Sequence, residues 1–414
     1  MSTSTVSSTA GPPSVSQVPL SRPAPGIIAA LFFGYLAVGL PLPVLPIFIH
    51  EQLGFSSLVV GLVIGVQFVA TLWTRGHAGR LVDQRGGKRA ALQGAAISAV
   101  AGLCYLVATV PGLSPAARLA VIVVGRLVAG IGESLFVTGC VSWSIASVGQ
   151  QRAGLSMSWT GIAMFAALSI GAPIGMLLFQ QHGLAAVMFA CIAAPLVAAA
   201  VAFLAPKFVS PAGNRLPFLQ VVRQIWREGF GLALQGVGLA ALTTFASLYF
   251  SARGWGHAGW VMSFFGVGFI VTRIAFGQWP DRIGGYRVAF WSFVVEAIGQ
   301  SMLWLAPNEG VALAGALVTG LGCALIYPAL GVEALTRVLP ANRGSAMGAF
   351  TAFLDIAYGL AGPVAGWVAG HMGYGAVFVL GAACALAGLA LVQISRKASR
   401  LPPSNPTPNR AAPY

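Results

Sequence analysis

The sequence predicts an all-α integral membrane protein in which twelve transmembrane helices form two pseudo-symmetric six-helix bundles. Three observations indicate this fold: 57% of the 414 residues are hydrophobic and only 8% are charged, apolar runs of about 18 to 25 residues recur along the chain, and one charged, glycine-containing motif occurs twice. A soluble globule of this size would need far more polar surface. Strands of a membrane barrel would instead show alternating segments of about ten residues.

Twelve apolar runs are long enough to cross a membrane as helices, and the longest polar stretch within the chain separates the first six from the last six. The predicted spans are 26–49, 57–78, 90–110, 118–146, 153–179, 183–205, 229–250, 257–279, 288–306, 311–335, 344–369 and 373–395. This division predicts an N-terminal bundle at 26–205, a linker at 206–228 and a C-terminal bundle at 229–395. The polar ends, 1–25 and 396–414, are expected to be disordered tails.

The distribution of basic residues predicts the orientation in the membrane. If both tails share one side, 18 of the 23 Lys and Arg residues fall on that side. Because basic loops are retained in the cytoplasm, we predict a multi-pass protein of the inner membrane with both termini cytoplasmic. The net charge of +14 is then explained by topology and by attraction to anionic lipid headgroups, and no nucleic-acid partner is expected.

The duplicated motif reads GRLVDQRGGKR at 79–89 and GQWPDRIGGYR at 277–287, which is 198 residues later. Thr74-Arg75 and Thr272-Arg273 precede the two copies in the same register, so the chain is predicted to be an internal duplication. Each copy is expected to form a tight, glycine-permitted turn between two spans. The motif residues are Gly79, Asp83, Arg85, Gly86, Gly87 and Arg89 in the first copy, and Gly277, Asp281, Arg282, Gly285 and Arg287 in the second.

Two six-helix halves, a basic central loop and the Gly-x-x-x-Asp-x-x-Gly-Gly pattern at both equivalent loops together resemble the major facilitator superfamily over residues 26–395. Within it, the segments Gly39–Pro46 and His77–Arg80 resemble the YhhS-like, efflux-type bacterial permeases. The resemblance implies a secondary transporter whose halves rock around a midplane site. It also implies that both motif copies are conformational latches, with Asp83 accepting hydrogen bonds from the start of span eleven near Gly344 and Ser345, while Arg85, Lys88 and Arg89 hold anionic headgroups.

Two further elements bear on ion coupling. Gly125–Gly132 in span four is similar to an Arg-x-x-Gln-Gly-x-Gly element of proton-coupled members, with Ala129 in place of the Gln. The antiporter element Gly-Pro-x-x-Gly is matched by Gly362–Gly366 in span eleven, whereas Gly171–Gly175 in span five has its Pro displaced by one position. The resemblance therefore favours proton coupling more than it favours antiport.

The few charges within spans are candidates for transport chemistry, because an ionisable group in hydrocarbon needs a partner or a wet cavity. Asp355 lies near the middle of span eleven and is predicted to load and release a proton; the alternative is a buried hydrogen-bond acceptor. Arg126 and Glu133 are two helical turns apart in span four, about 10 Å. They are predicted to bracket a substrate or water cluster, with Glu133 a second proton-coupling candidate, unless they form an interhelical polar lock.

Other polar residues receive more limited expectations. Glu296 is expected to be structural, and Glu333 is expected to pair with Arg337, four residues later. Arg75 and Arg273 are expected to reach the cytoplasmic interface as parts of two gates, or as simple interfacial anchors. Three aromatic residues, Tyr35, Tyr327 and Tyr358, could contact substrate, although packing roles are the competing interpretation.

The sequence also excludes several functions. It contains no nucleotide-binding Gly-x-x-x-x-Gly-Lys-Ser/Thr motif, no nucleophile elbow and no His or carboxylate pattern typical of a metal site, so no enzyme activity, metal or cofactor is predicted. We predict a monomeric, proton-coupled exporter of a small organic solute. A proton symporter or uniporter for import, a transport-inactive receptor and a membrane enzyme are the alternatives. Three Arg residues within spans favour an anionic or zwitterionic solute, whereas a lipophilic cation would use Glu133 as its counter-charge.

Overall fold

The computed structural model describes residues 21–208, 218–339 and 343–398, and within these ranges the chain is helical without strands. Most of the two predicted tails and the middle of the predicted linker lie outside the described residues. Nine of the described helices are long and apolar enough to span a membrane. One of these is two spans joined end to end, and two shorter helices complete the twelve.

The N-terminal half begins with a broken span. It consists of α1 (Pro25–Gly39), α2 (Val44–Ile47), the π-helical turn η1 (Phe48–Gln52), α3 (Ser57–Arg85), α4 (Gly87–Val107), α5 (Pro115–Val148), the 3₁₀ turn η2 (Gln150–Arg152) and α6 (Ala153–Leu204). The long α6 contains the predicted fifth and sixth spans, and it turns at Gly183 with φ 75° and ψ −175°. Such backbone angles are essentially restricted to glycine, which explains why the two spans meet there without a loop.

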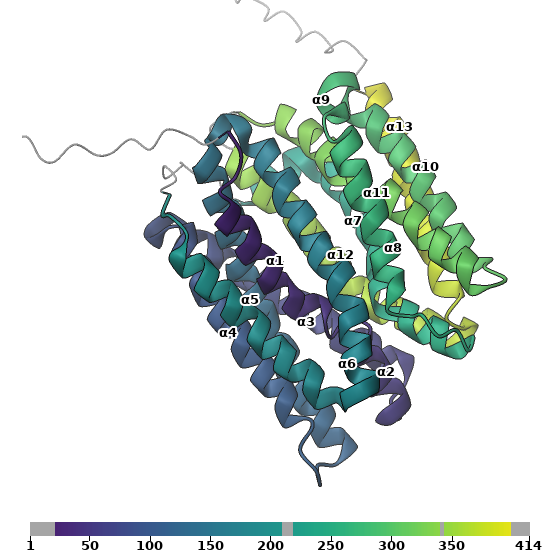
Figure 1. Cartoon of the computed structure of the whole chain (residues 1–414). Helices are drawn as coiled ribbons and strands as arrows, with labels where there is room; N and C mark the ends of the chain where they lie inside the picture. The colour runs from purple at the N-terminus through teal and green to yellow at the C-terminus, as the bar shows by residue number, and fades with distance from the viewer. Residues whose placement is uncertain (1–20, 209–217, 340–342, 399–414) are drawn as a thin grey trace, which may run out of the picture.

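The C-terminal half repeats this order. It consists of α7 (Phe218–Ala252), α8 (Trp260–Phe276), α9 (Trp279–Ile283), α10 (Gly285–Trp304), α11 (Glu309–Thr336), α12 (Arg343–Met372) and α13 (Ala376–Ala398). Figure 1 shows the two halves side by side, the first coloured purple to teal and the second green to yellow. They meet mainly where α3 packs on α12 and where the first part of α6 packs on α8.

The duplicated motif forms a narrower turn than the sequence predicted. The α3 helix continues through Gly79 to Arg85, and only Gly86, with φ 84°, leaves the helical conformation before α4 begins at Gly87. In the second copy Gly284 has φ 94° and plays the same part before α10. We call this side of the molecule the motif end and the opposite side the far end.

Lys88 has a different role from the predicted contact with lipid headgroups. Its Nζ donates hydrogen bonds to the carbonyl oxygens of Phe203 at 2.8 Å and Ala205 at 2.6 Å. Phe203 is in the last turn of α6 and Ala205 directly follows the helix, where no further helical amide is available to bind their carbonyl groups. Lys88 therefore caps α6 and ties it to the beginning of α4.

At the far end, glycines bring α3 and α12 into backbone contact. Gly61 lies against the carbonyl group of Gly362 and Gly65 against that of Gly359, so closely that a β-carbon on either α3 glycine would overlap backbone atoms of α12. Small residues spaced by one turn allow this kind of approach between membrane helices. Both halves are therefore closed on each other at the far end.

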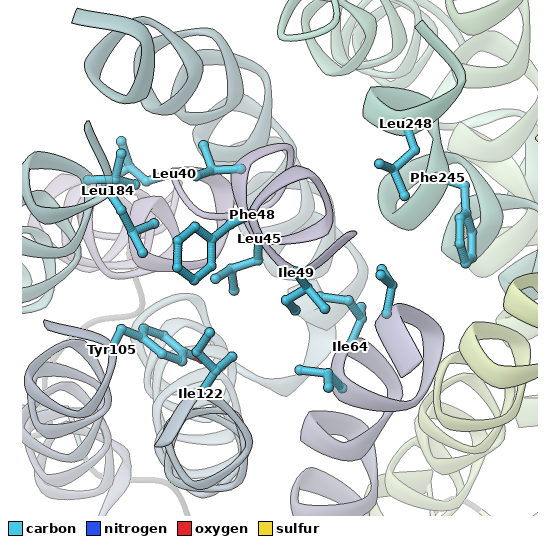
Figure 2. Close-up of a cluster of buried hydrophobic side chains, with 14 of the residues drawn as sticks. Leu40, Leu45, Phe48, Ile49, Ile64, Tyr105, Ile122, Leu184, Phe245 and Leu248 are labelled. Carbon is cyan, nitrogen blue, oxygen red and sulfur yellow. The ribbon is translucent and has the colours of Figure 1, made fainter. Parts of the chain in front are cut away.

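Apolar and polar contacts extend this closure across the other helices. Figure 2 shows a buried cluster in which Leu45, Phe48 and Ile49 of the broken first span share a core with Phe245 and Leu248 of α7. Nearby, the hydroxyl of Ser251 donates to Glu51 at 2.6 Å, which joins the two halves directly.

A second polar contact at the far end involves the short loop between α12 and α13. The Tyr374 hydroxyl is hydrogen-bonded to the Ser57 hydroxyl at the start of α3, at 3.1 Å. Burial raises the pKa of Tyr374, and the Ser57 hydrogen bond lowers it in part. The phenol is therefore neutral at physiological pH, and this link between the halves does not depend on a charge.

Candidate functional site

The candidate site begins with a small cavity inside the N-terminal half, enclosed by α1, α3, α4, α5 and α6. Its volume is about 20 Å³, enough for about one water molecule. Its polar lining is formed by Tyr35, Gln67, Ser98, Tyr105, Arg126 and Glu133. The structure thus brings Arg126 and Glu133 to one cavity, as the spacing within span four predicted.

The two charges in this cavity differ in how well they are satisfied. Both oxygens of Glu133 accept hydrogen bonds, one from the Tyr35 hydroxyl at 3.0 Å and one from Gln67 Nε2 at 2.6 Å. Arg126 is 4% exposed and donates from Nη2 to the Ile64 carbonyl oxygen at 3.1 Å, but its Nε has no hydrogen-bond partner within the described chain. The hydroxyl of Tyr105 is likewise unpaired there. The cavity therefore offers two unpaired groups that can donate, the Arg126 Nε and the Tyr105 hydroxyl.

A second group of charges lies between the two halves. Arg75 on α3 pairs with Asp355 on α12, with 2.5 Å between Nη2 and Oδ2, and their side chains are 21% and 7% exposed. Tyr327, hydrogen-bonded to Thr351 at 3.0 Å, is within electrostatic range of this pair. Glu133 is also within electrostatic range of Asp355, so the charge of one carboxylate influences the other.

Arg273 contradicts the expectation that it reaches the membrane interface. It is 6% exposed, its guanidinium group lies 5.5 Å from the centre of the Phe269 ring, and its Nε has no partner among the described groups. Gly161 on α6 lacks a side chain and leaves room for the guanidinium there. Arg273 is therefore held at the α6–α8 seam, where packing space is available, and does not snorkel.

The aromatic candidates divide between these two regions. Tyr35 belongs to the cavity, and Tyr327 is close to Arg75, Asp355 and Arg273. Tyr358 packs across the interface between the halves, with its ring centre 4.9 Å from that of Phe68. A role for these tyrosines in contacting a solute stays a prediction.

The predicted pair between Glu333 and Arg337 is wrong. Arg337 binds Glu228 instead, with 2.9 Å between Nε and Oε1, and Tyr286 donates to the same carboxylate at 2.5 Å. Glu333 accepts a hydrogen bond from the backbone N–H of Tyr286 at 3.1 Å. Arg337 is at the end of α11, from where its side chain reaches Glu228, and the fully buried Glu228 carboxylate needs a counter-charge.

The partner predicted for the first motif, near Gly344 and Ser345, lies outside the residues whose surroundings the structure describes, so the latch stays a prediction. In the second motif, Arg282 Nη2 donates to the Gln278 side chain at 2.6 Å. Within the described ranges, no three His, Cys, Asp or Glu side chains gather as they would around a metal ion.

An all-helical chain of two repeated bundles, with charges buried along their seam, is a multi-pass membrane transport protein in architecture. The family model described as Major Facilitator Superfamily matches residues 27–258 and 256–413, which is nearly the whole described chain in two repeats. The chain therefore belongs to the major facilitator superfamily, as the motif pattern predicted. Its membership of the YhhS-like, efflux-type branch stays a prediction.

Relatives in bacteria and structures of distant members agree with this assignment. An uncharacterised MFS-type transporter of Salmonella typhimurium is 44% identical over 368 residues, covering 89% of this chain and 95% of that protein. One from Burkholderia mallei is 43% identical, covering 88% and 90%. The fold matches the human organic anion transporter MFSD10, with a TM-score of 0.68, and a variant of the nucleoside transporter NupG, with 0.72. Each is 16% identical, with 89% of this chain and 98% of the other covered.

Proposed function

We propose that this chain is a proton-coupled exporter of a small organic solute in the bacterial inner membrane, working by alternating access. The observation that carries the proposal is the ion pair between Arg75 and Asp355, which joins the two halves next to the cavity of Arg126 and Glu133. Protonation of Asp355 would remove one charge of that pair. The contact between α3 and α12 would then weaken, and proton binding would be linked to the rocking of the halves.

The charges of the loops predict how the protein is oriented in the membrane. Both motif copies and the basic linker would face the cytoplasm, so the closed far end would face the periplasm. In this state the cavity holds about one water, so a solute needs the halves to separate before it can enter. The two motif copies and the two gates at Arg75 and Arg273 are proposed to set how easily the halves separate.

An acidic solute is better supported than a cationic one. Two buried guanidinium groups, Arg126 and Arg273, have an unpaired Nε and no carboxylate partner among the described residues, while both oxygens of Glu133 are already occupied by donors. A carboxylate or similar acceptor on the solute could accept hydrogen bonds from these unpaired donors. MFSD10 is an organic anion transporter by name, which agrees with this choice of solute class.

A screen by thermal shift on the purified protein, with organic acids, nucleosides and lipophilic cations, would identify the solute class. A compound that binds the folded state raises the unfolding temperature. We expect organic acids to stabilise the protein. Stabilisation by lipophilic cations alone would contradict the anionic assignment and favour Glu133 as the counter-charge.

Replacing Arg126 with Ala is expected to weaken binding of the identified solute by about 10- to 150-fold. This range corresponds to roughly 1.5 to 3 kcal/mol for hydrogen bonds to a charged group. Binding can be measured by isothermal titration calorimetry on the detergent-solubilised protein. Arg118→Ala is the matched control, because Arg118 is on the same helix but outside the cavity. Equal affinities in both variants would leave Arg126 with a packing role.

The alternatives make different predictions for liposomes that contain the protein. An importing symporter or uniporter would concentrate or equilibrate the solute in the opposite direction, a receptor would bind without moving it, and an enzyme would change its mass. Flux measured from each side of oriented liposomes, followed by mass spectrometry of the solute, separates these cases.

A further inference from the structure

A second buried carboxyl group lies in the C-terminal half, away from the route described above. Glu296 on α10 is 0% exposed, and neither of its side-chain oxygens has a hydrogen-bond partner within the described residues. It lies beside the backbone of Gly238 and the amide of Gln300, and the Cys323 thiol faces it without reaching hydrogen-bond geometry. Gln300 donates to the Gly238 carbonyl at 3.2 Å, but its own Oε1 is also unpaired.

The internal repeat relates this position to the cavity of the N-terminal half. Ser98, which lines that cavity, is followed by Glu296 after the same 198 residues that separate the two motifs. The packing agrees: Gly132 on α5 lies against Ser98, and Gly322 on α11 lies against Glu296. The two halves therefore place a carboxyl group at the same helix seam, on α5 in the first half and on α10 in the second.

The surroundings of the two carboxyl groups differ in one decisive respect. In the N-terminal half, Gln67 and Tyr35 donate to Glu133 and can stabilise it as an anion. The repeat counterpart of Gln67 is Phe265, because Gly130 packs on the Gln67 carbonyl just as Gly320 packs on that of Phe265. An aromatic ring cannot provide the amide donor, so an ionised Glu296 would be buried without compensation.

We propose that Glu296 is a second proton-binding site, which holds its carboxyl group in the neutral form in the closed state seen here. A neutral carboxyl group avoids burying a charge that no donor among the described residues stabilises. The inference goes beyond the proposed transport route, since the proton is held by a carboxyl group that the route does not use; only its effect on solute preference rests on the proposed function.

The proposal also affects the charge along the buried seams. With Glu296 neutral, the half-buried Arg75 and the buried Arg126 and Arg273 outnumber the carboxylates of Glu133 and Asp355 by one charge. The remaining positive charge would attract an acidic solute. If Glu296 gave up its proton during the cycle, that preference would be cancelled and release of the solute favoured.

The test is infrared difference spectroscopy of the purified full chain, which detects the C=O stretch of protonated carboxyl groups by its shift in D₂O. We expect Glu296→Gln to remove a protonated-carboxyl band that Glu133→Gln leaves in place, and Asp355→Asn to leave that same band unchanged. An unchanged band in Glu296→Gln would show that Glu296 is ionised and would overturn the proposal. Loss of the band when NaCl replaces choline chloride would overturn it too, because Glu296 would then bind sodium.

Glu296→Gln keeps the size of the side chain, and its folding is checked by gel filtration before the spectra are compared. If that variant does not fold, Cys323→Ala provides a second reading. Because the Cys323 thiol faces the carboxyl group, its removal should shift the frequency of the Glu296 band without abolishing it. A spectrum identical to that of the unaltered chain would then contradict the proposal. Neither of these contradicting results would change the expected loss of solute affinity in Arg126→Ala. The proton site at Glu296 and the proposed transport function can therefore be rejected separately.

Discussion

Replacing Asp355 with Asn is expected to reduce solute-driven proton movement to the level of liposomes that lack the protein. Asn has nearly the same shape as Asp but cannot take up a proton and carries no charge to pair with Arg75. Exchange of labelled for unlabelled solute across the membrane should persist, because that half of the cycle needs no net proton transfer. A pH-sensitive dye trapped in the liposomes measures the protons, and radiolabelled solute measures the exchange.

The matched control is Glu309→Gln, which neutralises a carboxyl group at the start of α11, outside the seam between the halves. It should transport protons like the unaltered chain. If Asp355→Asn also did so, Asp355 would have no coupling role, and Glu133 would become the remaining candidate of the proposed route.

A double-mutant cycle tests the ion pair itself. Arg75→Ala, Asp355→Asn and their combination are compared by thermal unfolding in detergent. Breaking a fully buried pair costs roughly 3 to 5 kcal/mol. Because the Arg75 side chain is 21% exposed, we expect a smaller coupling energy here. A coupling energy of zero would mean that the two residues contact each other without stabilising the closed state.

The sequence predicted the fold well because the fold depends on signals that hydropathy records directly. Long apolar runs and the polar break near the middle extend over many residues, and the duplicated motif shows that the two halves are repeats. Each signal can therefore be recognised in the sequence alone. Helix ends were less predictable: α3 was expected to stop at 78 and continues to Arg85. Its last turns carry charged residues, and hydropathy cannot distinguish a polar helical turn from a loop.

The charges of the site were also found from sequence, since ionisable residues in apolar runs are conspicuous. Their partners were not. Glu133 binds Gln67, which is 66 residues away, and Arg337 binds Glu228, 109 residues away. Such pairings depend on how separate helices pack, whereas the sequence rule used for Glu333 and Arg337 assumes one continuous helix. For Glu296, which the sequence predicts to be structural, the sequence alone does not show that both carboxyl oxygens lack a hydrogen-bond partner among the described residues.

The second large effect is expected from Gly61, where α3 touches the backbone of α12. A β-carbon at this position would overlap the Gly362 carbonyl group, so Gly61→Ala should force the two helices apart at the far end. Overpacking of this kind costs about 1 to 3 kcal/mol, which corresponds to roughly a 5- to 150-fold shift away from the closed state. The shift would favour the conformation that is open at the far end.

Cross-linking across the far end measures this shift. Ser251 and Glu51 are hydrogen-bonded at 2.6 Å in the closed state. We therefore expect Ser251→Cys and Glu51→Cys, in a chain whose five native cysteines are replaced, to be joined readily by a short bifunctional thiol reagent that makes up for the length of the lost glutamate side chain. Adding Gly61→Ala should slow this cross-linking, by up to the factor given above.

Gly76→Ala is the matched control for this experiment, because it is on the same helix and a β-carbon there meets no atom within 4 Å. Both substitutions raise helix propensity by about 1 kcal/mol, so this contribution cancels in the comparison. A difference between the two variants then reports only the contact with α12. Equal rates of cross-linking would mean that the far end opens without separating α3 from α12, and the halves would have to pivot about that contact instead.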